Sequence, residues 1–166
     1  MAAAAAAHAL GVSLFGIATG LGAVQPVKGR TVAQLATNGM RVIDDTYNAN
    51  PTSMCAAVDI LAGFSGRTVL VLGDIGELGD WAEQGHRDVG EYARGKVSAL
   101  YAVGPMMTHA VKAFGEQAFH FSTQAELIKA LGAEQDTNTT ILIKGSRSAA
   151  MENIVAALCG SRMEKH

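Results

Sequence analysis

The sequence is poor in charge at its N-terminal end and has no strong excess of either sign elsewhere. Residues 1–27 contain no Lys, Arg, Asp or Glu, and the whole chain of 166 residues has 13 basic and 15 acidic side chains, a net charge of −2. No stripe of Lys and Arg marks it as a partner of nucleic acid or of an anionic membrane. We therefore expect its ligand to be a small molecule.

The uncharged N-terminal stretch is neither a signal peptide nor a membrane span. No basic residue follows Met1, and the polar His8, Ser13, Thr19 and Gln25 interrupt its alanines and glycines. A signal peptide begins with positive charge, and a bilayer helix needs a longer and more apolar run. We expect a cytoplasmic protein.

Cysteine is scarce, and several catalytic motifs are missing. Cys55 and Cys159 each lie in an apolar helical pattern, which predicts reduced thiols in the core rather than a disulfide framework. The sequence has no GxxxxGKS/T phosphate-binding loop, no GxSxG elbow, no HExxH motif and no His or Cys at metal-ligand spacing. The chain alone therefore cannot carry out ATP chemistry of the phosphate-loop kind, and we expect no metal site in it.

The hydrophobic pattern divides the chain near residue 30. An alanine run over 2–10 and a segment over 13–22, capped by Ser13, predict a pair of short helices. Their small side chains offer little area to bury, so we interpret the pair as a remnant of another domain that packs on a larger body. Pro26–Arg30 is predicted to be a linker, which gives a first unit of residues 1–29 and a domain of residues 30–166.

From residue 31 onward the pattern predicts one hairpin and then alternating helices and strands. Asn38-Gly39 is a turn dipeptide between strands over 31–37 and 40–45. Apolar runs predict further strands over 68–72, 99–103, 118–121 and 140–143, with helical periodicity between and after them. This alternation is typical of an α/β, Rossmann-like domain whose mostly parallel sheet has helices on both faces.

Several residues predict where helices begin. Asn50 before Pro51 fits an N-cap, Asp80 and Glu83 fit a capping box, and Pro105 is expected to open a helix.

Polar residues collect where the strand over 40–45 ends. Asp44 and Asp45 close the strand, and Asn48 and Asn50 follow it. Strand alternation sends one carboxylate inward or sideways and the other into the crevice at the sheet edge, where open α/β sheets bind ligands. These groups suit ribose hydroxyls or the water of a bound cation, although a strand-end role for one Asp and a capping role for Asn50 are alternatives.

Two later strand ends are also polar. The loop over 73–80 lacks the GxGxxG spacing, and its carboxylates would repel a pyrophosphate, so it positions an adenine or a neighbouring domain or is only a tight turn. The segment over 144–148 has two cations and two hydroxyls at the predicted start of the last helix, which is typical of a carboxylate or phosphate receptor. His86, on the helix after the glycine-containing loop, could face this edge of the sheet, but we expect it to be solvated or at the core edge.

Four ordered segments together resemble one protein family, the Mur ligases. They are Pro26–Arg30, Asp44–Pro51 with Ser53-Met54, Gly73–Gly79, and Lys144–Ser148 with Met151-Glu152. The resemblance extends over nearly the whole chain. It is to the C-terminal part of members that join D-alanyl-D-alanine to UDP-N-acetylmuramoyl-tripeptide in peptidoglycan precursor synthesis.

The resemblance implies a domain that works only with others. Mur ligases have a domain for the UDP-sugar, a central ATPase domain and a C-terminal Rossmann-like domain that closes over the nucleotide. The family uses ATP to activate a carboxylate as an acyl phosphate, with Mg²⁺ held mostly by the central domain. We therefore expect the chain to need the other two domains and both substrates as partners, and to be an inactive ligase fragment alone.

The resemblance also implies roles for particular residues. Arg30 would reach the ATP phosphates and Asp45 would hold the ribose hydroxyls, with Asn48 and Asn50 lining the nucleotide side. The peptide or the dipeptide would face four residues at the last strand end: Lys144, Ser146, Arg147 and Ser148. Two loop residues would lie near the adenine or the domain interface: Asp74 and Glu77. It assigns no catalytic residue.

A free-standing regulatory domain of the receiver type, or a nucleotide-binding module without an enzyme, is the alternative. Asp44, Asp45, Asp74 and Lys144 superficially fit the acidic and lysine positions of a receiver. However, Asp74 follows the next strand in sequence rather than the one after it, and Val103-Gly104-Pro105 supplies no hydroxyl at the fourth strand end. The ligase interpretation is therefore preferred.

Overall fold

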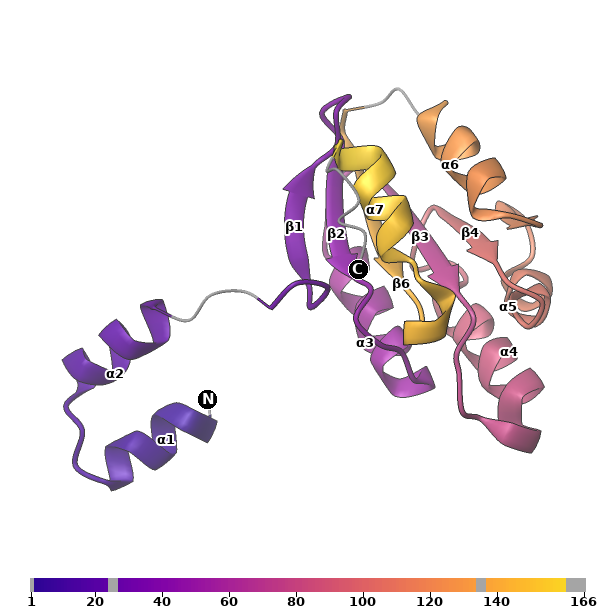
Figure 1. The fold of residues 1–166 in the computed structure, drawn as a ribbon. Helices are drawn as coiled ribbons and strands as arrows, with labels where there is room; N and C mark the ends of the chain where they lie inside the picture. The colour runs from indigo at the N-terminus through magenta and orange to yellow at the C-terminus, as the bar shows by residue number, and fades with distance from the viewer. Residues whose placement is uncertain (1, 24–26, 134–136, 161–166) are drawn as a thin grey trace.

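The computed structural model describes residues 2–23, 27–133 and 137–160, and it begins with two short helices. These are α1 (Ala2–Ala9) and α2 (Leu14–Gly22), and the Ser13 hydroxyl accepts the Gly16 N–H as the cap of α2. Figure 1 shows the pair lying beside each other and apart from the sheet. No helix in the described ranges has the length and apolar content needed to cross a bilayer.

A six-stranded sheet forms the centre of the remaining chain. Its spatial order is β1 (Val32–Leu35), β2 (Arg41–Asp45), β6 (Thr139–Lys144), β3 (Arg67–Gly73), β4 (Ala99–Val103) and β5 (Ala118–Phe121). The β1–β2 hairpin is antiparallel and every other neighbouring pair is parallel. The predicted α/β class, the mostly parallel sheet and the N-terminal hairpin are therefore confirmed.

Helices cover both faces of this sheet (Figure 1). One apolar cluster joins the sheet to α3 (Pro51–Ala62), α4 (Ala82–Ala93) and α5 (Met107–Phe114), and a second joins it to α6 (Gln124–Gly132) and α7 (Glu152–Cys159). Along β3, Leu70 and Leu72 belong to the first cluster, whereas Val69 and Val71 belong to the second. This division follows from the two-residue period of a strand, which sends successive side chains to opposite faces.

The two cysteines lie on opposite faces, as free thiols. Cys55 of α3 packs against the first cluster and Cys159 of α7 against the second. Burial is the main reason that the pKa of each thiol is raised. The prediction of unpaired, core-packed cysteines is confirmed.

Three predicted helix starts differ from the structure. The predicted capping box of Asp80 and Glu83 is wrong, because a 3-10 turn over Gly79–Trp81 leads into α4 and Trp81 occupies the cap position without a side-chain hydrogen bond. Pro105 lies in a turn, and α5 begins only at Met107, whose N–H is bound by the Asp74 carboxylate at 3.0 Å. An acceptor from a neighbouring strand end, rather than a local residue, therefore caps α5.

The third difference concerns the segment over 144–148, which does not open α7. Residues Arg147–Ala149 form a 3-10 turn, Ala150 adopts a left-handed conformation with φ 48°, and α7 starts at Glu152. The Ala149 N–H is satisfied locally by the Ser146 carbonyl. The cations and hydroxyls of this segment therefore do not lie at the N-terminus of α7.

Helix α4 comes so close to α5 at Gly90 that one added methyl group there should destabilise the domain. A Cβ built on Gly90 would collide with the Ala110 carbonyl, whereas one built on Gly132 at the end of α6 would meet nothing within 4 Å. We expect Gly90→Ala to lower the free energy of unfolding by about 1–3 kcal/mol, because rigid backbone must move. Urea unfolding measures the change. Gly132→Ala is the control, and a Gly90→Ala protein at least as stable as it would contradict the close contact.

Candidate functional site

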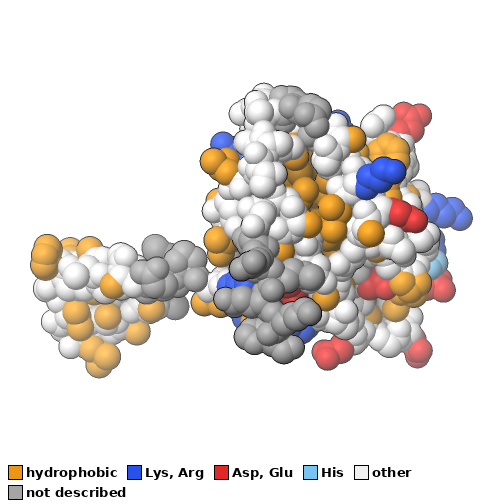
Figure 2. All heavy atoms as spheres, turned by 45° about the horizontal axis from the view of Figure 1, so that its top comes forward, with side chains coloured by type: hydrophobic (Ala, Val, Ile, Leu, Met, Phe, Trp, Pro, Cys, Tyr) orange, Lys and Arg blue, Asp and Glu red, His pale blue; other side chains and the backbone are white. Residues whose placement is uncertain are grey.

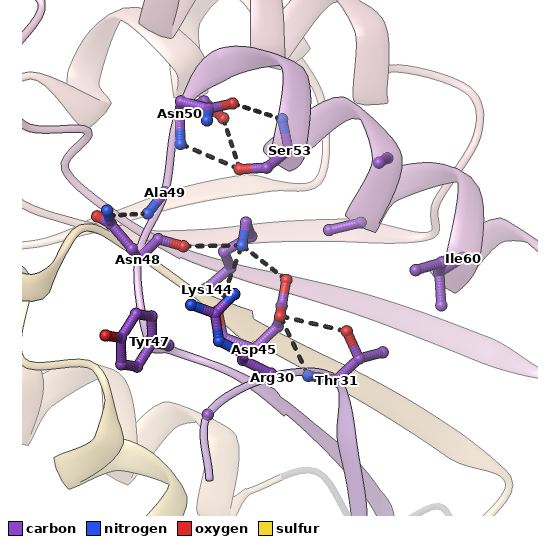
Figure 3. Close-up of a pocket in the computed structure, with 13 residues that line it drawn as sticks. Arg30, Thr31, Asp45, Tyr47, Asn48, Ala49, Asn50, Ser53, Ile60 and Lys144 are labelled. Atoms are coloured by element: carbon purple, nitrogen blue, oxygen red, sulfur yellow. Dashed lines mark hydrogen bonds and ion pairs between the residues drawn. The ribbon is translucent and has the colours of Figure 1, made fainter. Parts of the chain in front are cut away.

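A polar pocket opens where β2 and β6 end. Its volume is about 410 Å³, and Figure 3 shows that its wall comes from the segment before β1, the β2–α3 connection, α3 and the end of β6. It is lined by Gly29, Arg30, Thr31, Asp45, Tyr47, Asn48, Ala49, Asn50, Ser53, Ala56, Ala57, Ile60 and Lys144. Two of the three polar strand ends that the sequence singled out, those of β2 and β6, therefore meet at this pocket.

An ion pair between neighbouring strands forms the centre of the pocket wall. Asp45 and Lys144 are register partners on β2 and β6, and the Lys144 ammonium lies 2.6 Å from Asp45 Oδ2. It also donates to the Asn48 carbonyl at 2.9 Å and to the Asp45 carbonyl at 3.4 Å. The Lys144 side chain is only 4% exposed and that of Asp45 17%.

The other oxygen of this carboxylate holds the residue that precedes β1. Asp45 Oδ1 accepts the Thr31 N–H at 3.1 Å and the Thr31 hydroxyl at 3.2 Å. Thr31 has φ 53°, a left-handed conformation that is costly for a β-branched residue. Two hydrogen bonds to one carboxylate oxygen therefore stabilise a turn that the chain would otherwise disfavour.

Arg30 stands beside this turn with its charge in the pocket. Its guanidinium carbon lies 4.2 Å from the centre of the Tyr47 ring, an arrangement that favours a cation over an aromatic face (Figure 3). Gly29 fixes the backbone before it: its carbonyl accepts the Tyr47 N–H at 2.9 Å. A Cβ there would come within 2.9 Å of the same nitrogen, so glycine is required.

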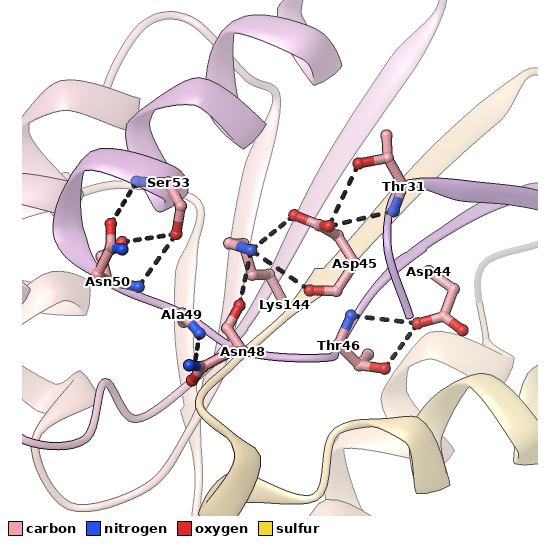
Figure 4. Close-up of polar contacts among 9 residues, drawn as sticks. All are labelled: Thr31, Asp44, Asp45, Thr46, Asn48, Ala49, Asn50, Ser53 and Lys144. Atoms are coloured by element: carbon pink, nitrogen blue, oxygen red, sulfur yellow. Dashed lines mark hydrogen bonds and ion pairs between the residues drawn. The ribbon is translucent and has the colours of Figure 1, made fainter. Parts of the chain in front are cut away.

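The two adjacent aspartates have different surroundings. Asp44 is buried and accepts the Thr46 hydroxyl at 2.6 Å and the Thr46 N–H at 3.2 Å, whereas Asp45 faces the pocket (Figure 4). Strand alternation predicted this split. The interpretation of one of the pair as a strand-end group is confirmed for Asp44.

The two asparagines also differ. Asn50 caps α3, because its side chain accepts the Ser53 N–H at 2.8 Å while the Ser53 hydroxyl accepts the Asn50 N–H at 3.0 Å. The predicted N-cap is confirmed, although Asn50 also lines the pocket. Asn48 is exposed, and its side-chain oxygen accepts the Ala49 N–H at 2.9 Å.

The remaining polar residues form a second group past the end of β6. Ser146 is buried and donates its hydroxyl to the Asp74 carbonyl at 2.7 Å, and its Oγ lies 3.1 Å from that of Ser148. Arg147 is 71% exposed and contacts Glu152 at 3.1 Å. None of these residues lines the pocket described above. The sequence placed Lys144 with this second group, but the structure places it in the pocket.

The glycine-containing loop after β3 is fixed by His86, whose burial the sequence analysis did not anticipate. His86 is fully buried, its Nε2 accepts the Ile75 N–H at 3.0 Å, and its Nδ1 lies 2.6 Å from the Ala82 carbonyl. These partners require the neutral ring with its hydrogen on Nδ1. Asp74 Oδ1 lies 3.9 Å from Nε2, while Glu77 is exposed with φ 61°. The expectation of a solvated or core-edge histidine is therefore wrong.

A family comparison identifies the domain that carries this site. Residues 29–147 match the family described as "Mur ligase, glutamate ligase domain". The chain belongs to the Mur ligase family. The family resemblance stated from the four ordered segments is thereby confirmed, and the receiver-type alternative is not supported.

Curated relatives of this Mur ligase chain carry one name. This chain is 44% identical over 163 residues to the UDP-N-acetylmuramoyl-tripeptide--D-alanyl-D-alanine ligase of Escherichia coli. It is 33% identical over 174 residues to the protein of the same name from Bacillus subtilis. The alignments cover 95% and 97% of this chain but only 35% and 37% of the relatives. The chain therefore spans about a third of the length of the relatives it matches.

Solved structures of similar Mur ligases have the same fold. A crystal structure of MurF from Acinetobacter baumannii superposes with a TM-score of 0.84 at 41% identity, covering 96% of this chain and 36% of that one. The MurF ligase of Thermotoga maritima, solved in complex with ADP, gives a TM-score of 0.79 at 22% identity, covering 94% and 36%. The second likeness concerns the fold alone.

The buried histidine predicts a specific loss of stability. Replacing His86 with Phe keeps a planar aromatic ring but leaves the buried Ile75 N–H without an acceptor, which costs about 1–3 kcal/mol of unfolding free energy. Urea unfolding of the chain measures this change. His109→Phe on α5, where the histidine is only half-buried, is the control. Equal stability of the His86→Phe and wild-type proteins would show that the Ile75 contact has no energetic role.

Proposed function

We propose that this chain is the C-terminal domain of an ATP-dependent ligase that joins D-alanyl-D-alanine to UDP-N-acetylmuramoyl-tripeptide during peptidoglycan precursor synthesis in the cytoplasm. The family match and the shared name of its relatives support this activity. Because the chain spans about a third of those relatives, the proposed activity belongs to a longer protein. The single observation that carries a nucleotide role for this domain is the pocket with Arg30 and Asp45 on its wall.

The pocket residues suit the sugar and phosphates of a nucleotide. Asp45 keeps an acceptor position beyond its bonds to Thr31 and Lys144, since a carboxylate offers about four lone-pair sites. A ribose hydroxyl can donate to it. Arg30 supplies an exposed guanidinium that can form paired bonds with phosphate oxygens, and within the described ranges no ion pair engages it. Asn48 and Asn50 would line the same side.

ATP would supply the phosphoryl group that activates the tripeptide carboxylate as an acyl phosphate. The domain's own contribution is to hold the nucleotide from one side and to keep water from the reactive centre on closure. Mg²⁺ would offset phosphate charge, held mainly by a central domain. Among the described residues no three His, Cys, Asp or Glu side chains stand together as a metal site.

The acceptor dipeptide would lie past the end of β6. Arg147 is the cation there with the most exposed side chain, and its bond to Glu152 leaves further N–H donors for a carboxylate. Ser146 and Ser148 add hydroxyls beside it. Asp74 and Glu77 would stand near the adenine or the domain interface, where Asp74 joins the loop to Ser146.

The N-terminal helices would belong to a central domain. Large apolar side chains gather on the surface of this short helical pair (Figure 2), where Leu10, Leu14 and Phe15 are 84%, 73% and 83% exposed. We propose residues 1–29 as the end of that domain with its linker, and residues 30–166 as the closing domain. The bond between the Gly29 carbonyl and the Tyr47 N–H attaches this residue to the closing domain, which supports a linker that ends close to Arg30.

The acceptor role of Arg147 predicts a selective kinetic defect. In the complete ligase, Arg147→Ala should raise the KM for D-alanyl-D-alanine by about tenfold or more, because a hydrogen bond to a charged group is worth about 1.5–3 kcal/mol. The KM for ATP should change little. Steady-state kinetics measures both, with the exposed Arg87→Ala on α4 as control. Unchanged dipeptide KM and kcat would remove Arg147 from this role.

The incomplete nucleotide site predicts weak binding by the chain alone. The described pocket offers one exposed guanidinium, and the sequence has no phosphate-binding loop, so most phosphate contacts lie elsewhere. Calorimetric titration of the isolated chain with ATP should give no binding tighter than about 100 µM. An isotherm near 1 µM would instead support an independent nucleotide-binding module.

A further inference from the structure

Lys144 is placed where it can orient other groups but has little left to offer a ligand. An ammonium group has three hydrogens, and three acceptors surround this one: Asp45 Oδ2, the Asn48 carbonyl and, more distantly, the Asp45 carbonyl. Only 4% of the side chain is exposed. Arg147, three residues later, is 71% exposed, and its contact with Glu152 leaves further N–H donors for a ligand. A direct contact between Lys144 and an acceptor dipeptide would require breaking this arrangement.

Hydrogen bonds connect Lys144, through Asp45, to Thr31, the residue that follows Arg30. Its ammonium holds Oδ2 of Asp45, and Oδ1 of the same carboxylate holds both the N–H and the hydroxyl of Thr31. Figure 4 shows these three side chains in one row across the end of the sheet. Thr31 needs such support, because its φ of 53° is unfavourable for a β-branched residue.

We propose that Lys144 is a positioning residue of the nucleotide half of the site, acting through Asp45 on the Thr31 turn and thereby on Arg30. This rests on the proposed function, in which Asp45 and Arg30 hold the nucleotide. Lys144 balances the charge of Asp45 and fixes which carboxylate oxygen faces Thr31. Lys144 serves the reaction by fixing the positions of Asp45 and Thr31, and it makes no contact with either substrate.

The test compares two Michaelis constants in the complete ligase. Lys144→Met keeps a long unbranched side chain, one atom shorter than that of lysine, and removes its charge. We expect it to raise the KM for ATP by about tenfold to a hundredfold, since a displacement near 1 Å has effects of that size, and to leave the KM for D-alanyl-D-alanine within about twofold. Lys96→Met is the matched control, because it removes another Lys–Asp contact of 2.9 Å, on the surface between α3 and α4. Its ATP KM should remain that of the wild type.

A double variant separates this role from general destabilisation. If Lys144 acts only through the Asp45 carboxylate, Lys144→Met combined with Asp45→Asn should have the ATP KM of Asp45→Asn alone, within about twofold. If the double variant instead had an ATP KM raised by the product of the two single effects, the proposal would be overturned. A Lys144→Met ligase in which the dipeptide KM rises and the ATP KM does not would also overturn it.

A measurement on the unmodified chain remains informative if Lys144→Met fails to fold. Nuclear magnetic resonance of a ¹⁵N-lysine-labelled chain should show slow hydrogen exchange at the Lys144 ammonium and fast exchange at Lys112, which is exposed on α5. Equally fast exchange at both would contradict the buried contacts. Failure of the wild-type ligase to join the dipeptide to the tripeptide would instead refute the proposed function, and it would leave this exchange result unaffected.

Discussion

The candidate site depends on the ion pair between Asp45 and Lys144, which closes the ends of two neighbouring parallel strands. Removing a carboxylate and an ammonium from water is costly, and such a pair is tolerated only when both groups are hydrogen-bonded as well. Here that condition is met, because Thr31 satisfies one carboxylate oxygen and backbone carbonyls satisfy the ammonium. The pair is therefore better understood as a device that fixes geometry than as a source of stability.

The sequence predicted the elements of this domain well because most of its local signals agree. Alternation at the end of β2 correctly separated Asp44 from Asp45, and Asn50 with Pro51 correctly marked the start of α3. The capping box predicted at Asp80 failed because a 3-10 turn over Gly79–Trp81 precedes the helix. Burial of His86 could have been recognised, since it shares a helical face with Val89 and Ala93.

It was harder to predict how the site residues are arranged than which residues belong to the site. Lys144 and Asp45 are 99 residues apart, and only the strand order, with β6 inserted between β2 and β3, makes them neighbours. A hydrophobic pattern specifies that strands exist but not which ones pair. Lys144 was therefore grouped with Ser146 and Arg147, its neighbours in sequence. The left-handed Thr31 had no sequence signal, because a β-branched residue is among the last expected there.

The strained turn at Thr31 affects how Arg30, on the proposed nucleotide side of the pocket, is organised. A non-glycine residue in this region of backbone space costs about 1–3 kcal/mol, which the bonds to Asp45 offset in the folded domain. Because Arg30 directly precedes the turn, its backbone direction is set before any ligand binds. Its guanidinium already lies over Tyr47, on the wall of the pocket. A group ordered in advance loses less conformational entropy on binding, so strain held at Thr31 favours recognition at Arg30.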